Sequence, residues 1–424
     1  MNGMSDLRFS EITPEELDAL SLGTPHSSFI QSAAMARAQS RGRETACFGV
    51  KEDGVLVAGA LVVCRTERRF FKVAHINQGP VIDLERKDLV AFFFSGLREA
   101  LAKRGVTYCL VTPNVEVVLR DLDGEVVPGG FDHADLLANL TAAGLEYLGP
   151  DDSLINGVGR WMFVKDFEGI ASEKDFFKSV DRSVRRQYRT ADELHVQIVE
   201  LPSDGMEPFF DVLSHTGERR GFDTRDDFLV ALKEEFGDKC RVLLAQLDVK
   251  AGIEILESEI RKLNTEITRV TKQRQKQDSD GLRRRLEVLA EQIPPTQDRI
   301  AVLRELLGSG VELANLAAGI FFEHGNEYTH FMGGTYEEFM HVNLNGNNFL
   351  ATSQMLRLVE SSALDRYNFY GTFGRFSGSE DEGVYRFKRR FGGRILEQPG
   401  NYRFVVSAPR MKAFDLLGRL AGKG

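Results

Sequence analysis

A heptad repeat between Lys250 and Leu307 constrains the fold of this 424-residue chain more than any other feature. Apolar residues recur there at alternating spacings of three and four, first at Ile253, Leu256, Ile260, Leu263, Ile267 and Val270, then again from Leu282 to Leu307. This periodicity is typical of helices that bury one seam against a partner helix. Two helices of about 25 residues joined by the polar stretch 275–281 can bury their seams only against each other. The sequence therefore predicts an antiparallel coiled-coil arm over residues 249–308, kinked or loosened at Pro294 and Pro295.

The sequence on either side of the arm contains an internal repeat. Each half shows the order strand, strand, strand, helix, strand, and the arm replaces the short turn KEDG of the first half. The main segments are 47–64, 89–105 and 106–112 in the first half and 241–248, 311–322, 348–364 and 367–371 in the second. Alternating short strands and helices predict two related α/β units, each a mixed sheet flanked by helices. We expect the first unit at 1–152 and the second at 153–248 and 309–424.

Composition and motif content exclude several classes of protein. The net charge is −9, so any nucleic-acid contact must come from a local basic patch. Four scattered cysteines (Cys47, Cys64, Cys109 and Cys240) suit neither a disulfide framework nor a zinc site. No apolar run approaches 18 residues and the N-terminus lacks the apolar stretch of a signal peptide, so we expect a cytoplasmic protein. The eight histidines form no HExxH motif and no pairing with Cys at ligand spacing, and Gly-rich phosphate loops are missing, so we expect no metal and no cofactor.

Two clusters combine basic and aromatic residues. Within 215–228, Arg219, Arg220 and Arg225 surround Phe222, and guanidinium groups suit phosphate or carboxylate ligands. An exposed helix end with solvated charges would give the same pattern. In the second cluster, Lys388 lies between Phe387 and Phe391 and precedes a pair of glycines. Such a lysine is either a partly desolvated cation directed at a ligand or a surface charge with a buried aliphatic stem.

The predicted tip of the arm is basic. Between residues 269 and 285 only Asp278 and Asp280 oppose the cations Arg269, Lys272, Arg274, Lys276, Arg283, Arg284 and Arg285. A basic tip on an acidic protein favours an anionic partner, either an RNA backbone or a phospholipid surface. A tip that is charged only to stay soluble is the alternative.

Taken in order, several segments resemble the FemABX family of peptidyltransferases, which build the side branches of bacterial peptidoglycan. The matching blocks are SSFIQSAAMARAQ (27–39), NQGPVID (77–83), FFDVLSHTGERRGFDTRDDF (209–228), ANLAAGIFFEHGNEYTHFMGGT (314–335) and YNFYGT…GVYRFKRRFGG (367–393). An inserted coiled coil at this place is a further hallmark of the family members that use aminoacyl-tRNA. The chain departs from the family pattern mainly in the first unit, at Met35, Gln39, Asn77 and Thr112, so we place the candidate site residues in the second unit.

The resemblance implies two GNAT-like (acyl-CoA N-acyltransferase-like) mixed-sheet units and an aminoacyltransferase activity. An amino acid would pass from aminoacyl-tRNA to the side-chain amine of the stem peptide in a peptidoglycan precursor, either lipid-linked or UDP-linked, and so build the interpeptide bridge. Lys388 and Phe387 match the family's FK motif and are the candidate catalytic residues. Arg225 and Arg220, with Arg219 and Phe222, are the candidates for the diphosphate of the precursor, and the block at 314–335 adds His330 and Thr335 as substrate contacts.

Two other functions remain open from the sequence. A coenzyme A-dependent N-acyltransferase would share the fold but would need a pyrophosphate-binding turn of the Q/R-x-x-G-x-G/A kind. A non-catalytic interaction protein would use the arm to bind another protein. The seven basic residues at the tip favour tRNA over a protein partner, and the same charge allows a peripheral contact with the inner face of the membrane.

Overall fold

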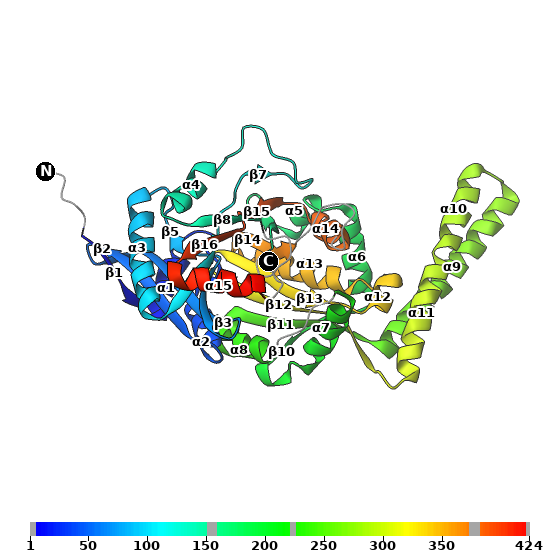
Figure 1. Ribbon diagram of the computed structural model, residues 1–424. Helices are drawn as coiled ribbons and strands as arrows, with labels where there is room; N and C mark the ends of the chain where they lie inside the picture. The colour runs from blue at the N-terminus through cyan, green and yellow to red at the C-terminus, as the bar shows by residue number, and fades with distance from the viewer. Residues whose placement is uncertain (1–5, 151–158, 221–225, 373–381, 421–424) are drawn as a thin grey trace.

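The computed structural model describes residues 6–150, 159–220, 226–372 and 382–420. Two eight-stranded mixed sheets lie side by side in one body, and a long helical arm projects from the second sheet (Figure 1). This confirms the predicted fold class of two mixed α/β units with an inserted arm. Within the described residues, no helix is long and apolar enough to cross a membrane.

The first sheet has the strand order β1-β2-β3-β4-β6-β16-β8, with β5 paired to β3. Its strands are β1 (Leu7–Ile12), β2 (Thr45–Glu52), β3 (Val55–Glu67), β4 (Phe71–Asn77), β5 (Val81–Ile82), β6 (Val106–Thr112), β8 (Glu146–Gly149) and β16 (Asn401–Val405). All pairs are antiparallel except β4 and β6, which are joined by helix α3 (Lys87–Lys103). Helix α3 buries Leu89, Phe93, Leu97 and Leu101, four residues apart on one face, and so covers the sheet.

The second sheet repeats this arrangement in the order β10-β11-β12-β13-β14-β9-β15-β7. Its strands are β7 (Leu119–Arg120), β9 (Trp161–Asp166), β10 (Gln197–Leu201), β11 (Cys240–Asp248), β12 (Leu313–His324), β13 (Glu327–Gly334), β14 (Arg366–Thr372) and β15 (Arg394–Glu397). Strands β13 and β14 form the parallel pair, and α13 (Gly346–Ser361) joins them as α3 joins β4 and β6. The internal repeat seen in the sequence is therefore a repeat of topology.

The two units exchange one strand each. Strand β7 lies in the first unit but pairs with β15 of the second sheet, whereas β16 lies in the second unit but sits between β6 and β8 of the first sheet. The expected division is corrected here, because Asn401–Val405 belongs to the first sheet and Leu119–Arg120 to the second. The physical reason is edge pairing: each sheet fills its open position with a strand of the other unit, which a sequence repeat does not show.

The units also share an apolar core. In each unit, two helices lie in the chain between the first two strands of the sheet. These are α1 (Pro14–Leu22) and α2 (Ala33–Ser40) between β1 and β2, and α7 (Glu207–Arg220) and α8 (Asp226–Phe236) between β10 and β11. Phe29 of the first unit stacks on Phe322 of the second at 4.4 Å between ring centroids. Arg37 of α2 and Arg41, directly after this helix, form ion pairs with Glu235 of α8. The remaining helices are α4 (Ala134–Ala142), α5 (Glu173–Lys178), α6 (Arg182–Glu193), α12 (Glu337–His341), α14 (Glu382–Arg389) and α15 (Ala408–Leu420).

The arm consists of α9 (Val249–Lys276), which runs outward, and α10 (Asp280–Glu291) and α11 (Ile293–Gly308), which return. Asp248 caps α9, and Pro294 and Pro295 occupy the first turn of α11, where proline needs no helical hydrogen-bond partner. The prolines therefore divide the returning helix in two, as predicted. At the base, the Val249 amide donates to the Glu312 carbonyl, which closes the β11/β12 hairpin beneath the arm.

Candidate functional site

The second sheet opens between its two parallel strands. Strands β13 and β14 pair only from Glu327 with Arg366 to Thr329 with Asn368, whereas β4 and β6 pair along their whole length in the first sheet. The register also shifts on both sides of the opening, between Ile320 and Phe321 of β12 and between Asn368 and Gly371 of β14. Tyr370, within the second shift, has a φ of 56°. The ends of β13 and β14 therefore diverge and leave backbone groups of β14 available to other partners.

Lys388 occupies this opening. It lies in the last turn of α14 and is 7% exposed, and its Nζ donates to the carbonyl oxygens of Tyr370 at 3.0 Å and Gly371 at 3.2 Å. The ammonium also lies 5.7 Å from the centroid of the Phe163 ring on β9. A buried charge is stable only where polar groups replace its water, and the two carbonyls provide such groups. The sequence placed Lys388 between Phe387 and Phe391, but the aromatic ring that it faces comes from another strand.

Phe387 and the glycine pair hold α14 in position. The Phe387 ring packs against Phe391 and Phe369, with centroids 5.3 and 6.3 Å away. Gly393 has a φ of 93°, and a side chain there would collide with the Val164 carbonyl of β9. The turn after α14 therefore lies directly against the sheet, which fixes the depth at which Lys388 enters the opening.

His330, on β13, is close enough to Lys388 to be affected by its charge. Its Nδ1 is 3.1 Å from the Tyr367 hydroxyl oxygen, and its ring packs on Phe321 with a centroid separation of 4.4 Å. Burial, and next the charge of Lys388, lower the pKa of His330 to about 3, so the imidazole is neutral at physiological pH. A Cβ at Gly333 would lie 2.7 Å from the His330 Nε2, so the neighbouring glycine makes room for the ring. Two predicted site residues, Lys388 and His330, thus come together from segments 58 positions apart in the chain.

Three of the other predicted substrate contacts lie on α7 or beside it. Thr335 is buried, and its hydroxyl donates to the Leu316 carbonyl at 2.7 Å while its amide donates to the Thr216 hydroxyl of α7. In the structure Thr335 therefore connects β12, β13 and α7 within the fold. Arg219 and Arg220 end α7. Phe222 and Arg225 lie outside the described residues.

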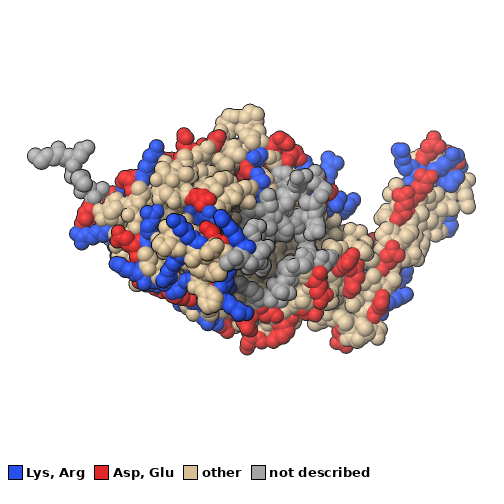
Figure 2. Space-filling view, in the orientation of Figure 1, with Lys and Arg blue, Asp and Glu red and all other residues tan. Residues whose placement is uncertain are grey.

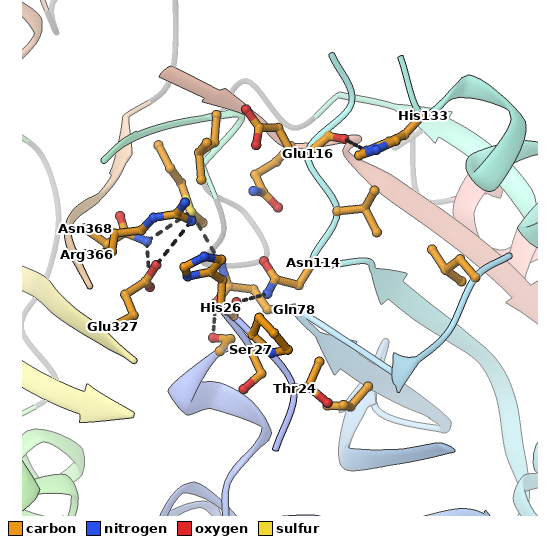
Figure 3. A pocket seen from close by; sticks show the side chains of 18 of the residues that line it. Thr24, His26, Ser27, Gln78, Asn114, Glu116, His133, Glu327, Arg366 and Asn368 are labelled. Carbon is orange, nitrogen blue, oxygen red and sulfur yellow. Dashed lines mark hydrogen bonds and ion pairs between the residues drawn. The ribbon is translucent and has the colours of Figure 1, made fainter. Parts of the chain in front are cut away.

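A pocket of about 410 Å³ lies between the two units. Figure 3 shows Glu327, Arg366 and Asn368 of the second sheet facing it from one side and His26 and Asn114 of the first unit from another. Tyr370, whose carbonyl accepts a hydrogen bond from Lys388, also lines the pocket. The segment of β14 around Tyr370 therefore forms part of the pocket wall and also binds Lys388.

A chain of ion pairs crosses one side of the pocket. Arg366 donates to Asp166 at 2.5 Å, Arg394 lies 3.5 Å from the other oxygen of Asp166, and Arg394 also pairs with Glu116. Burial raises the pKa values of both Glu116 and Glu327, although Arg394 and Asn368 respectively oppose the shift. These side chains come from both units, because Glu116 follows β6 of the first sheet and the others belong to β9, β13, β14 and β15 of the second sheet.

Sequence reasoning missed the pocket residues. The available signal was charged and amide side chains inside or directly after apolar strands, such as Glu327, Arg366 and Asn368, and Asn114 and Glu116 after β6. Buried polar residues of this kind need partners, so they indicate that strands from elsewhere lie nearby. The strand exchange determines which partners they find. Among the described residues, no group of three His, Cys, Asp or Glu side chains could hold a metal ion.

The seven predicted cations lie in the last turns of α9 and the first turns of α10, and Figure 2 shows Lys and Arg together with Asp and Glu at the end of the arm. Arg269 and Arg285 pair with Glu266, and Arg274 and Arg283 pair with Asp278. Hydrogen bonds from Arg283, and next from Arg274, lower the pKa of Asp278 to about 2. Among the described residues, Lys272, Lys276 and Arg284 are exposed and form no ion pair. The tip is therefore less basic than the local count suggested, since Glu266 lies outside the stretch that was counted.

The chain is similar to a family of known proteins in sequence and in fold. The model of the FemAB family matches residues 12–419. Aminoacyltransferase FemA of Staphylococcus aureus strain N315 is 25% identical over 422 residues, which covers 98% of this chain and 99% of the relative. The same protein of the bovine strain RF122 / ET3-1 is 25% identical over 420 residues, with the same coverage. The crystal structure of FemX superposes with a TM-score of 0.71 at 20% identity, over 96% of this chain and 99% of the other, and so shows a shared fold.

These matches confirm the resemblance drawn from the sequence blocks. The family model spans both sheets and the arm, and the FemA relatives are similar over nearly their full length. The chain belongs to the FemAB family and is an aminoacyltransferase.

Proposed function

We propose that this aminoacyltransferase moves an amino acid from aminoacyl-tRNA to the side-chain amine of the stem peptide in a peptidoglycan precursor. The observation that carries the proposal is a buried lysine at the opening of the second sheet, in a chain of the FemAB family. An aminoacyl ester is already activated, so the reaction needs no covalent enzyme intermediate. It needs alignment of amine and ester, removal of one ammonium proton and stabilisation of the oxyanion.

Lys388 is the candidate for oxyanion stabilisation. Its ammonium is held by two carbonyls in a region of low dielectric, where a fixed charge acts more strongly on a developing anion than it would in water. The neutral ester gains less from this charge than the tetrahedral intermediate does. Lys388 would therefore lower the barrier of the chemical step more than it tightens donor binding. Phe387, which packs α14 against Phe369 and Phe391, would position the lysine.

The pocket between the units is the candidate site for the acceptor amine. It adjoins the Lys388 segment through Tyr370, and carboxylates of Asp83, Glu85 and Glu116 line it. A protonated amine is attracted by such carboxylates, and a carboxylate with a raised pKa is a better proton acceptor than an ordinary one. Arg219, Arg220, Phe222 and Arg225 remain the proposed contacts of the precursor's diphosphate, and His330 a contact near the donor.

The arm is the candidate tRNA contact. Its exposed cations lie at the end of a projection, where they reach a large polyanion without bringing it against the acidic body. Because both aminoacyl-tRNA and peptidoglycan precursors are found on the cytoplasmic side of the membrane, we also propose a cytoplasmic location.

Mass spectrometry of muropeptides tests this function in the cell. A strain that lacks the protein should accumulate stem peptides shortened by the mass of one or more bridge amino acids. Expression of the parent chain should restore the bridge, and expression of the Lys388→Met variant at the same level should not. Muropeptides of unchanged mass in the deleted strain would contradict the proposal.

A further inference from the structure

The C-terminal helix α15 is apolar on two opposite faces. Its inward face buries Met411 and Phe414, which form a small core with Val73 and Tyr108 of the first sheet. Leu416, which is 60% exposed, lies on its outward face, and Leu417, which is 42% exposed, lies on the adjoining flank. Position 416 lies two residues from Phe414, about 200° around the helix, so Leu416 points almost directly away from the body. A surface helix normally presents polar residues there.

The turn between β3 and β4 adds a second apolar protrusion beside this helix. Phe70 in that turn is 81% exposed. The turn is fixed against α15, because Arg68 donates to the Phe414 carbonyl and its guanidinium lies 3.9 Å from the centroid of the Phe414 ring. Phe70 and the two exposed leucines therefore belong to one region of the surface, although more than 340 residues separate them in the chain. We call Phe70, Leu416, Leu417 and the cations around them the α15 patch.

The charges around these side chains are mainly positive. Arg69, Lys412 and Arg419 are exposed, and Arg410 donates to the Gly105 carbonyl at the start of the helix. The neighbouring carboxylates on these two segments are Glu67 and Asp415. Figure 2 shows Lys and Arg gathered over this part of the body, with other residues between them. This local excess of cations stands on a protein whose net charge is −9.

We propose that the α15 patch docks the enzyme on an anionic lipid surface. Apolar side chains that enter the boundary between headgroups and acyl chains, ringed by Lys and Arg that meet anionic headgroups, are the two features such binding requires. The 13-residue helix is about 20 Å long and would lie in the plane of the membrane. A second copy of the chain fits less well, because a two-fold contact would place the cations of one patch against those of the other. The proposal concerns binding alone and does not depend on which acceptor the enzyme uses.

Co-sedimentation of the full chain with lipid vesicles tests this inference. Binding to vesicles that contain phosphatidylglycerol should exceed binding to pure phosphatidylcholine vesicles, and should weaken as salt rises. The triple variant Phe70→Ser, Leu416→Ser, Leu417→Ser should lose at least about tenfold in affinity for the anionic vesicles. Arg69→Gln, Lys412→Gln, Arg419→Gln should lose affinity for the anionic vesicles and flatten the salt dependence.

A matched control separates a defined patch from general stickiness. Val55→Ser, Val288→Ser, Leu313→Ser removes three exposed apolar side chains elsewhere and should bind the anionic vesicles as the parent does. Because all the substituted apolar residues are exposed, each variant should melt at nearly the parent temperature. The proposal is overturned if the parent does not bind anionic vesicles or if the two serine triple variants bind them equally. It is also overturned if sedimentation without vesicles shows that the patch drives dimer formation.

Discussion

The sequence indicated Lys388 as a candidate site residue, but it indicated the wrong neighbours for its side chain. The sequence showed a lysine flanked by aromatics, yet its partners are two carbonyls of β14 and the Phe163 ring of β9. Those carbonyls are available because β13 and β14 stop pairing after Thr329 and Asn368. Loss of strand pairing depends on local register, which the alternation of apolar residues does not encode. The sequence could therefore predict the residue but not its environment.

Substitution of Lys388 tests the catalytic role at the residue scale. Lys388→Met keeps the length of the side chain and removes the charge, and the single-turnover rate at saturating substrates should fall by about 10²–10³. Arg389→Met and Arg390→Met serve as controls for general loss of positive charge, and the thermal melt of each variant shows whether it is folded. A Lys388→Met rate within a few-fold of the parent, or no lower than the two controls, would assign the role to another residue.

Buried histidines should make the protein sensitive to acid. Burial lowers the pKa of His75 on β4 to about 4, so the unfolded chain takes up a proton at higher pH than the folded chain. Stability is thus fully present above the ordinary histidine pKa of about 6.5 and falls as the pH drops from there toward 4. The His75 contribution to this loss should be about 2 kcal/mol between pH 7.5 and pH 5.

Urea unfolding of His75→Leu at both pH values measures this contribution. The variant should lose about 2 kcal/mol less than the parent over the same interval, whereas His341→Leu, an exposed control, should follow the parent. Equal losses in parent and His75→Leu would show that other groups cause the acid sensitivity.

At the scale of elements, the arm was the most predictable feature of the molecule. The heptad spacing located both helices, and Pro294 and Pro295 marked the break that the structure shows between α10 and α11. The pattern was readable because a coiled coil is stabilised by contacts that repeat along its own sequence. Charge at its tip was harder to predict, because Glu266 pairs across the arm with Arg285, 19 residues away.

Deletion of the arm should separate folding from tRNA use. A two-residue turn in place of residues 250–311 needs to join only β11 and β12, whose ends the Val249–Glu312 hydrogen bond already holds together. The body should still melt cooperatively, while transfer from aminoacyl-tRNA should drop. An arm-deleted protein that transfers at the full rate would remove the arm from the reaction.

The free cations at the tip should control the salt dependence of tRNA binding. Neutralising Lys272, Lys276 and Arg284 to Gln should reduce the slope of log K against log salt by roughly two to three, if each contacts a phosphate. The matched control changes Lys250, Arg261 and Lys262 to Gln in the first half of α9, away from the tip, and removes the same charge. If both triples change the slope equally, the effect comes from overall charge, and the tip is not the RNA contact.

At the scale of the whole molecule, the exchange of β7 and β16 joins the two units into one body. The sequence repeat predicted two mixed sheets and the same order of strands and helix along the chain in each, because most of these strands have neighbours that are close in the chain. It could not assign β16 to the first sheet, since Asn401–Val405 pairs with β6 and β8 roughly 250 to 300 residues earlier. The pocket was hidden for the same reason, because Glu116, Asp166 and Arg394 meet only after the exchange.

The central claim is that this enzyme takes its acyl group from aminoacyl-tRNA and gives it to a peptidoglycan precursor. The most direct measurement is a single-turnover reaction of the purified full chain with lipid-linked or UDP-linked muramyl pentapeptide and one of three donors: aminoacyl-tRNA, free amino acids with ATP, or acetyl-coenzyme A. Mass spectrometry of the precursor should show the added mass of an aminoacyl residue with aminoacyl-tRNA alone, and Lys388→Met should strongly reduce it. Product formed from acetyl-coenzyme A, or an unmodified precursor with every aminoacyl-tRNA in a complete set, would contradict the account.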